Sequence, residues 1–296
     1  MNRLTFLKKA SLISTLPFFS SSHSLLDFEN YKIGLQLFSV KDAMEKDPVN
    51  TLKSLKEMGY QDFESYGYDA DKKKYYGFSP IEFKTILNDL GLTTSSGHYA
   101  INGLMESSNY ELFKYLDSCI NASLALGDKY IVYPMLNNKY HSYDGYKLLV
   151  NKLNQIGREI EKSGLNFAYH NFGYDFNLYN GKMGLEWIIE ETNPDWVKLQ
   201  VDFYWVMRAN KIMPKDLINL AQGRFKLWHI KDMDPITKDY TELGYGSIDY
   251  TTILPEPKLS GLQSYYLEQG GNYKLNSMDS ARKSIEFLKK NIQKLI

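Results

Sequence analysis

The sequence predicts a single-domain parallel (β/α)8 barrel, a TIM barrel of the α/β class, and three observations support this prediction. From Tyr31 onward, short β-rich runs alternate with longer amphipathic stretches, many of which end in glycine. Eight such units follow one another, which favours a closed barrel over an open doubly wound sheet. After the first run, Ser39-Val-Lys-Asp42 stands where a dinucleotide-binding fold would carry its glycine-rich fingerprint.

The expected strands are short and separated by clear helix signals. Asp47-Pro48 and Ser79-Pro80 are typical helix starts, and Gly59 is a typical helix end. Pro255 and Pro257 interrupt the connection after the seventh strand, so its helix is predicted to be weak. We expect strands at residues 33–38, 62–65, 93–98, 130–134, 166–170, 197–202, 225–230 and 264–268, and the main helices at about 48–58, 80–91, 110–126, 143–162, 184–191 and 277–295.

Composition excludes several classes of protein. The 35 basic and 35 acidic side chains cancel, so no long-range positive field attracts a nucleic-acid backbone, and we expect no nucleic-acid partner. Cys119 is the only cysteine in the sequence, so no intrachain disulfide and no cysteine cluster for a metal can form. Any metal ion must bind through histidine and carboxylate side chains.

The first residues are typical of an export leader. Arg3, Lys8 and Lys9 precede a short apolar run and a serine-rich stretch, which is the layout of a signal peptide. The segment also resembles a twin-arginine signal, although Leu4 stands where the second arginine belongs. We therefore expect a leader at 1–24, a barrel at 25–296, a periplasmic or secreted protein, and no membrane association after processing. The alternative is an amphipathic segment that caps the barrel.

Polar residues end several of the apolar strands. Barrel enzymes act at the C-terminal ends of their strands, so these positions are candidates for function. A single such residue is commonly a helix cap or a hydrogen-bonded structural residue. Here, however, strands five to eight end consecutively in His, Asp, His and Glu, which a closed barrel brings together. The candidates are Glu64, His98, His170, Asp202, His229 and Glu268.

Two imidazoles and two carboxylates are suitable ligands for Mn²⁺, Zn²⁺, Co²⁺, Fe²⁺ or Mg²⁺. A metal bound to adjacent sugar oxygens acidifies a hydroxyl and polarises a carbonyl, so that a proton can move between neighbouring carbons. We expect His170, Asp202, His229 and Glu268 to bind the metal. Lys231 is expected to stabilise an enediolate, and Asp232 is a predicted partner of His229.

Five segments together resemble the xylose isomerase-like barrels known as sugar phosphate isomerases/epimerases, and the resemblance runs from Ile33 to the final helix. They are Phe167-Ala-Tyr-His-Asn171, Val201-Asp-Phe-Tyr-Trp205, Leu227-Trp-His-Ile-Lys-Asp-Met-Asp234, Gly244-Tyr-Gly-Ser-Ile-Asp249 and Leu267-Glu-Gln269. The resemblance implies metal ligands at Asp202, His229 and Glu268. Many members have glutamate at the position of His170, where it pairs with the last glutamate as acid and base. This chain departs from that pattern there, and also at Phe172, where related sequences often have histidine.

The resemblance implies a metal-dependent sugar isomerase or epimerase that acts through an enediolate on a free sugar or keto-sugar. Glu268, His98, His170 and Lys231 are the predicted catalytic residues, and Glu64, His98, Lys231 and Trp205 the predicted substrate contacts. A 3-keto-glycoside lyase or hydratase on the same site, and an inactive periplasmic sugar-binding barrel, are the alternatives. Repair of abasic DNA, another activity of this fold, requires more histidines and a basic face. A homo-oligomer is compatible with the sequence.

Overall fold

A computed structural model describes residues 31–296, and these form one closed barrel of eight parallel strands. Around the barrel the order is β1-β12-β9-β8-β5-β4-β3-β2, and pairing of β1 with β12 closes it. The predicted single-domain (β/α)8 barrel is confirmed. The predicted leader at 1–24, together with residues 25–30, lies outside the described residues, so the leader stays a prediction.

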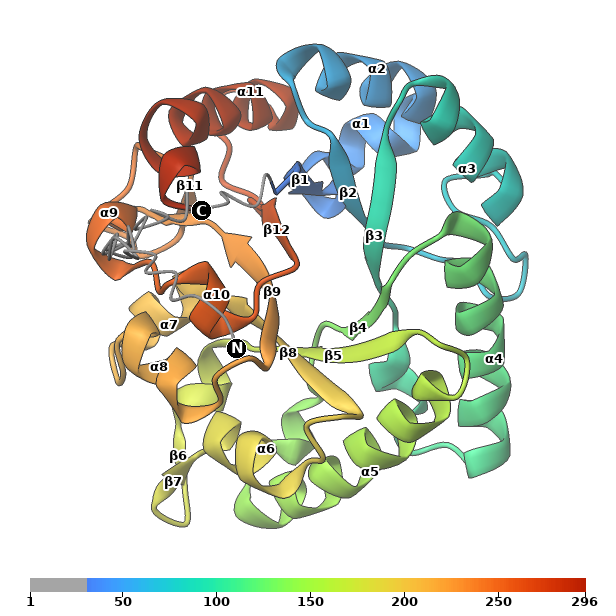
Figure 1. Cartoon of the computed structure of the whole chain (residues 1–296), viewed down its shortest axis with the longest axis vertical. Helices are drawn as coiled ribbons and strands as arrows, with labels where there is room; N and C mark the ends of the chain where they lie inside the picture. Colours follow the sequence, from blue (N-terminus) through green and yellow to red (C-terminus); the bar gives the residue numbers. More distant parts are fainter. Residues whose placement is uncertain (1–30) are drawn as a thin grey trace, which may run out of the picture. The chain divides into compact units, whose positions relative to one another are not determined.

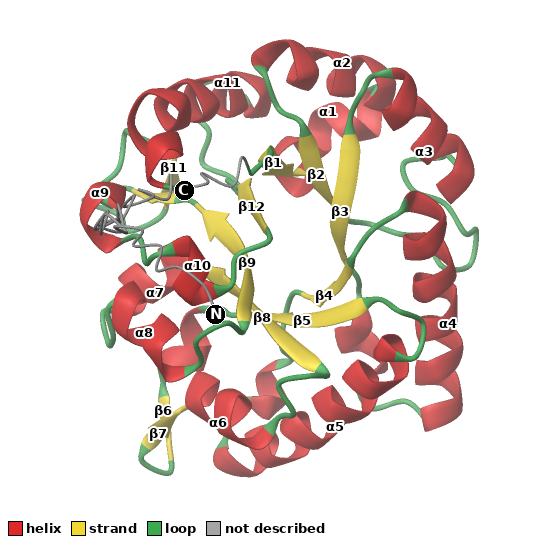
Figure 2. Cartoon of the chain, viewed as in Figure 1, coloured by secondary structure: helices red, strands yellow, loops and turns green. Residues whose placement is uncertain are grey.

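The strands form the inner ring and the helices surround them (Figures 1 and 2). Five of the eight strand predictions agree with the structure at both ends. The barrel strands are β1 (Ile33–Gln36), β2 (Asp62–Ser65), β3 (Thr93–His98), β4 (Tyr130–Tyr133), β5 (Asn166–His170), β8 (Val197–Asp202), β9 (Phe225–Ile230) and β12 (Ser264–Leu267).

The helices begin and end where local signals predict. The Ser79 side chain accepts a hydrogen bond from the Glu82 N–H, and Glu82 bonds back to the Ser79 N–H, which satisfies two free donors of the helix start. Gly59 and Gly127 end their helices in the left-handed conformation that only glycine adopts without strain. The helices are α1 (Lys41–Lys46), α2 (Pro48–Met58), α3 (Pro80–Asp89), α4 (Asn109–Leu126), α5 (Tyr143–Glu161), α6 (Gly184–Glu191), α7 (Phe203–Ala209), α8 (Pro214–Leu220), α9 (Tyr250–Ile253), α10 (Pro257–Ser260) and α11 (Ser277–Phe287).

Strands β4 and β12 each end one residue before their predicted ends, and β1 and α11 differ more. Strand β1 stops at Gln36 because the Gln36 side chain accepts a hydrogen bond from the Phe38 N–H and turns the chain into a 3-10 helix. The weak helix after the seventh strand is divided into α9 and α10, as the prolines predict. Helix α11 ends at Phe287 instead of Leu295, because residues 288–295 form a π-helical and then a 3-10 turn.

Two small antiparallel ribbons were not predicted. One pairs β6 (Leu178–Tyr179) with β7 (Lys182–Met183), and the other pairs β10 (Asp232–Met233) with β11 (Tyr240–Thr241). The second ribbon shapes the loop that follows β9. No helix among residues 31–296 has the length and apolar character needed to cross a bilayer.

A small apolar cluster fills the barrel interior. Alternate residues of a strand share one face, so Ala168, Leu227 and Tyr266 point the same way as the residues two positions later. Those residues are His170, His229 and Glu268. The cluster, which also contains Tyr130 and Val132, is fully or almost fully buried. It therefore forms an apolar layer beneath the strand-end residues. The larger core lies between the strands and the helices.

Helix α5 packs against the chain just before β8 at a glycine, and this contact generates a stability prediction. A Cβ added at Gly157 would lie 2.4 Å from the backbone oxygen of Trp196, so the helix would have to move. We expect Gly157→Ala to lower the free energy of unfolding by about 1–3 kcal/mol in urea titrations. Gly103→Ala, where nothing lies within 4 Å of the added Cβ, is the control and should change little. Equal stability of Gly157→Ala and the wild type would contradict this packing.

Candidate active site

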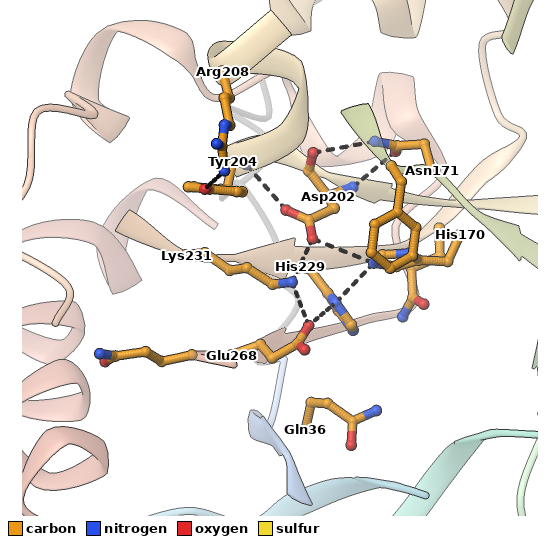
Figure 3. A network of polar contacts seen from close by, with 12 residues as sticks. Gln36, His170, Asn171, Asp202, Tyr204, Arg208, His229, Lys231 and Glu268 are labelled. Atoms are coloured by element: carbon orange, nitrogen blue, oxygen red, sulfur yellow. Dashed lines mark hydrogen bonds and ion pairs between the residues drawn. The ribbon is translucent and has the colours of Figure 1, made fainter. Parts of the chain in front are cut away.

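The strand-end residues gather at the C-terminal mouth of the barrel (Figure 3). His170 and Asp202 are the last residues of β5 and β8, His229 lies one residue before the end of β9, and Glu268 directly follows β12. His170, Asp202 and His229 are buried, whereas the Glu268 side chain retains 11% exposure. The structure therefore brings together the four side chains that were predicted as metal ligands.

One donor atom from each of these four residues lies within 4.8 Å of all the others. His170 Nε2 lies 3.3 Å from Asp202 Oδ2 and 3.2 Å from His229 Nδ1, and His229 Nδ1 lies 2.6 Å from Glu268 Oε2. Donor atoms that share one ion at about 2.1 Å lie about 3–4 Å apart, so small side-chain movements are enough to accommodate a divalent ion. The residues fit a metal, although their role as ligands stays a prediction.

Lys231 places a cation beside the same carboxylates. Its Nζ lies 2.6 Å from Asp202 Oδ2 and 2.8 Å from Glu268 Oε2, and the side chain is only 4% exposed. Burial opposes the charged form of Lys231, but Asp202 and Glu268 outweigh it and hold its pKa above the usual range. Burial likewise opposes ionisation of Glu268, yet Lys231 and His229 hold the pKa of Glu268 well below its usual range. Lys231 is therefore part of the site's charge balance.

The two strand-end histidines have different electrostatic surroundings. Burial lowers the pKa of His170 to about 4, despite the opposing hydrogen bond and charge of Asp202. Burial also disfavours the charged form of His229, but Glu64 and Glu268 outweigh it and raise the pKa of His229 to about 9. His229 lies between two carboxylates, whereas the other ring nitrogen of His170, Nδ1, is buried without a hydrogen-bond partner among the described residues.

Glu64, which stays a predicted substrate contact, lies against His229 and His98. It is fully buried, and burial would raise its pKa, but His98 and His229 outweigh this effect and hold the pKa well below its usual range. Glu64 Oε2 lies 2.5 Å from His229 Nε2. A carboxylate that holds the second nitrogen of a ligand histidine is the common support of metal sites.

His98 ends β3 and lies at the edge of the same group. Its side chain is 13% exposed, and its ring centroid lies 5.4 Å from those of both His170 and His229. His98 Nε2 lies 3.0 Å from Glu64 Oε2 and 2.9 Å from Gln200 Oε1. Like Glu268, His98 is thus a partly exposed titratable group next to the buried His170 and His229.

Gln36, Ser96 and Gln200 complete this network, and none of the three was predicted from the sequence. Gln36 Nε2 donates to Glu64 Oε2 at 2.9 Å, whereas Ser96 Oγ and Gln200 Nε2 donate to Glu64 Oε1 at 2.7 and 2.9 Å. Ser96 and Gln200 precede His98 and Asp202 by two residues, so strand alternation alone places them on the inner face. The alternation of inward and outward residues along β3 and β8 was therefore the signal that could have identified Ser96 and Gln200.

The predicted pairing of Asp232 with His229 is wrong. The Asp232 carboxylate instead accepts hydrogen bonds from the backbone N–H groups of Met233, Gly244, Gly246 and Ile248, at 2.8–3.1 Å. These bonds fold the loop after β9 back upon its start. Asp232 therefore shapes this loop, and Glu64 takes the place beside His229 that was predicted for Asp232.

An aromatic wall adjoins His170. The centroid of the Phe172 ring lies 4.9 Å from that of His170 and 5.3 Å from that of Trp205. The ring centroids of Trp205 and Tyr240 are 6.3 Å apart. Trp205 Nε1 is buried and has no hydrogen-bond partner among residues 31–296. Trp205, a predicted substrate contact, therefore has a donor without an acceptor, and only the Phe172 ring lies between it and the predicted metal ligand His170.

A parallel eight-stranded barrel with a cluster of His, Asp and Glu at its strand ends defines a class of barrels with a candidate metal centre. Residues 52–291 match the sequence profile of the xylose isomerase-like TIM barrels. The chain belongs to this family, as its sequence motifs predicted.

Solved structures of similar fold include several proteins with names from sugar metabolism. A sugar phosphate isomerase/epimerase from Parabacteroides distasonis is 26% identical with a TM-score of 0.78, over 90% of this chain and 96% of that one. The IolI protein with a bound zinc atom is 15% identical (TM-score 0.69, 90% and 99% covered), and an L-ribulose 3-epimerase is 16% identical (TM-score 0.65, 90% and 95% covered). No curated protein sequence matches the chain.

The loop that carries Phe172 is held by a buried acid, which predicts a pH dependence of stability. Asp175 accepts hydrogen bonds from the Phe172 N–H and from the hydroxyls of Tyr146 and Tyr169, and burial raises its pKa from 3.8 to about 7. Between these values the native chain holds a proton that the unfolded chain has lost. Stability should therefore fall as the pH rises through this range, by at most about 4 kcal/mol from Asp175.

The measurement is the free energy of unfolding at several pH values between 4 and 8, in the wild type and in Asp175→Asn. Burial raises the pKa of Asp128 to about 7 as well, so the slope should be smaller in the variant but not zero. The same slope in both proteins would show that Asp175 does not titrate in this range.

Proposed function

We propose that the protein is a divalent-metal-dependent sugar isomerase or epimerase that acts through an enediolate on a free sugar or keto-sugar. The observation that carries the proposal is the convergence of His170, Asp202, His229 and Glu268 on one point at the barrel mouth. Membership of the xylose isomerase-like family supports it, as do the sugar isomerase and epimerase names of structural neighbours and the zinc atom of the IolI protein. These likenesses leave the identity of the metal open.

His170, Asp202, His229 and Glu268 would hold the metal, which acts as a Lewis acid when bound and polarises the hydroxyl and carbonyl of the sugar. Glu268 is the most exposed of the four, and its carboxylate transfers a proton at the substrate carbon. Lys231, between Asp202 and Glu268, stabilises the negative charge that develops on the enediolate.

The aromatic wall provides the binding surface. Trp205 and Phe172, which are both partly exposed, offer ring faces against which the apolar face of a sugar packs. The site is closely packed and mostly buried, which strengthens the electrostatic interactions within it. These features favour a small sugar over a polymeric nucleic acid.

We also propose that residues 1–24 direct export, so that the mature barrel acts in the periplasm or outside the cell. The basic start followed by a short apolar run supports this proposal. N-terminal sequencing of the protein from its native source is expected to begin near residue 25. An intact Met1 in the mature protein would contradict export by a cleaved leader.

Metal content and activity test the function together. We expect the wild type to contain about one divalent ion per chain by elemental analysis and to incorporate deuterium beside the carbonyl of a sugar, followed by NMR in D₂O. Asp202→Asn removes a ligand charge at constant size, so metal content and turnover should both fall at least tenfold. The control, Asp195→Asn, changes an exposed aspartate.

A wild-type protein that takes up no Mn²⁺, Zn²⁺, Co²⁺ or Mg²⁺ would contradict the proposal. Loss of a leaving group in place of isomerisation would instead identify a lyase or hydratase. Sugar binding without deuterium incorporation would identify a binding protein.

A further inference from the structure

Glu64 connects more of the site than any other residue in the network around it. Its two carboxylate oxygens contact Gln36 from β1, Ser96 and His98 from β3, Gln200 from β8 and His229 from β9. The strand ladders shift register between Phe63 and Glu64 and again between Leu199 and Gln200. Such bulges redirect side chains next to active sites. The barrel is therefore irregular at two of the residues that form this network.

The hydrogen bonds determine which nitrogen of His98 carries hydrogen. Gln200 donates its amide nitrogen to Glu64 Oε1, so its amide oxygen faces His98 Nε2 at 2.9 Å. The other neighbour of His98 Nε2 is the Glu64 carboxylate, 3.0 Å away. Because both neighbours only accept, Nε2 must be the protonated nitrogen. In the neutral ring, Nδ1 then has a free lone pair, and it makes no hydrogen bond within residues 31–296.

Oxygen Oε2 of Glu64, the one that contacts His98, also sets the orientation of His229. Glu64 Oε2 lies 2.5 Å from His229 Nε2, which must therefore carry hydrogen, and this leaves His229 Nδ1 directed towards Glu268 and the other predicted ligands. One atom of Glu64 thus orients a predicted metal ligand and a partly exposed imidazole beside it. A carboxylate that holds a histidine whose other nitrogen faces the substrate is the arrangement used in general-base catalysis.

We propose that His98 is the second proton-transfer residue of the site and that Glu64 is its positioning residue. The inference rests on the proposed function and deepens it, because Glu268 is the one partly exposed carboxylate among the four predicted ligands, whereas Asp202 is fully buried. His98 Nδ1 takes the proton from the substrate carbon, and the C–H electron pair forms the C=C bond of the enediolate while the carbonyl oxygen becomes an oxyanion. Return of the proton to a carbon restores the neutral ring, and Glu64 stabilises the imidazolium in between.

A second metal ion is the competing use of Glu64, His98 and His229, since one donor atom from each lies within 4.8 Å of the others. The contacts around Glu64 argue against it. Both oxygens of Glu64 already accept hydrogen bonds from Gln36, Ser96 and Gln200, and both imidazoles present N–H groups to it. An ion at this position would have to remove both imidazole protons.

The tautomer is tested without any assay of activity. In the ¹⁵N-histidine NMR spectrum of the zinc-loaded chain, we expect His98 to show a protonated Nε2 and an unprotonated Nδ1. Glu64→Gln replaces one acceptor oxygen by a donor amide and should change this pattern for His98. The opposite tautomer in the wild type, an unchanged pattern in Glu64→Gln, or two zinc ions per chain would each overturn the proposal.

The kinetic test uses the sugar that shows deuterium incorporation with the wild type. His98→Gln should lower kcat by about 10²–10⁴-fold, with metal content unchanged and KM changed far less. Glu64→Gln should also lower kcat. Glu64→Asp keeps a carboxylate and should lower kcat less than Glu64→Gln does. The control is His141→Gln, which changes a histidine in the loop after β4 that has no contact with Glu64, and it should keep wild-type kcat.

The two proposals can fail separately. Retained kcat in His98→Gln, with an active wild type, would overturn the role of His98 and leave the isomerase or epimerase intact. A wild type inactive on every sugar would remove the proposed function, and the NMR result would still decide whether Glu64 sets the tautomer of His98.

Discussion

The site depends on the burial of three carboxylates, Glu64, Asp202 and Glu268, inside one barrel mouth. An isolated carboxylate in such surroundings would become protonated, because burial strongly disfavours its charge. Here Lys231 lies between Asp202 and Glu268, and His229 lies between Glu64 and Glu268, so each negative charge has a positive neighbour. Removing one partner from such a group leaves an uncompensated buried charge, which is why these residues must be considered as a unit.

Much of the fold follows from local signals in the sequence. Proline, serine and aspartate at helix starts and glycine at helix ends set the boundaries of α2, α3 and α4 closely. The end of α11 escaped prediction because the apolar spacing continues past Phe287, whereas the backbone changes to a π-helical turn there. The β10–β11 ribbon escaped because its strands are two residues long and depend on bonds made by the Asp232 side chain.

The candidate site was partly predictable for the same reason. The strand-end rule selects His170, Asp202, His229 and Glu268 without knowledge of distances, because a closed parallel barrel brings successive strand ends together. The same rule selected Glu64 and His98, but it did not predict that Glu64 would contact both His98 and His229. Gln36 and Glu64 are paired across the neighbouring strands β1 and β2, whereas Gln200 reaches Glu64 from β8, which is not a neighbour of β2 in the barrel order. The strand pairing also shifts register next to both Glu64 and Gln200. Alternation identifies an inward face, but contact across the barrel depends on its shear and radius.

The bonds that Asp232 makes with four backbone N–H groups divide the loop after β9 into two parts that differ in exposure. The inner part begins next to Lys231 and is held in place from both ends. The outer turn at residues 234–239 connects the two strands of the ribbon, and its Ile236 is 88% exposed. Homologous chains are therefore expected to vary in length and composition at this turn while the inner part keeps its shape, so that evolution can change what the rim of the barrel touches without disturbing the chemistry below it.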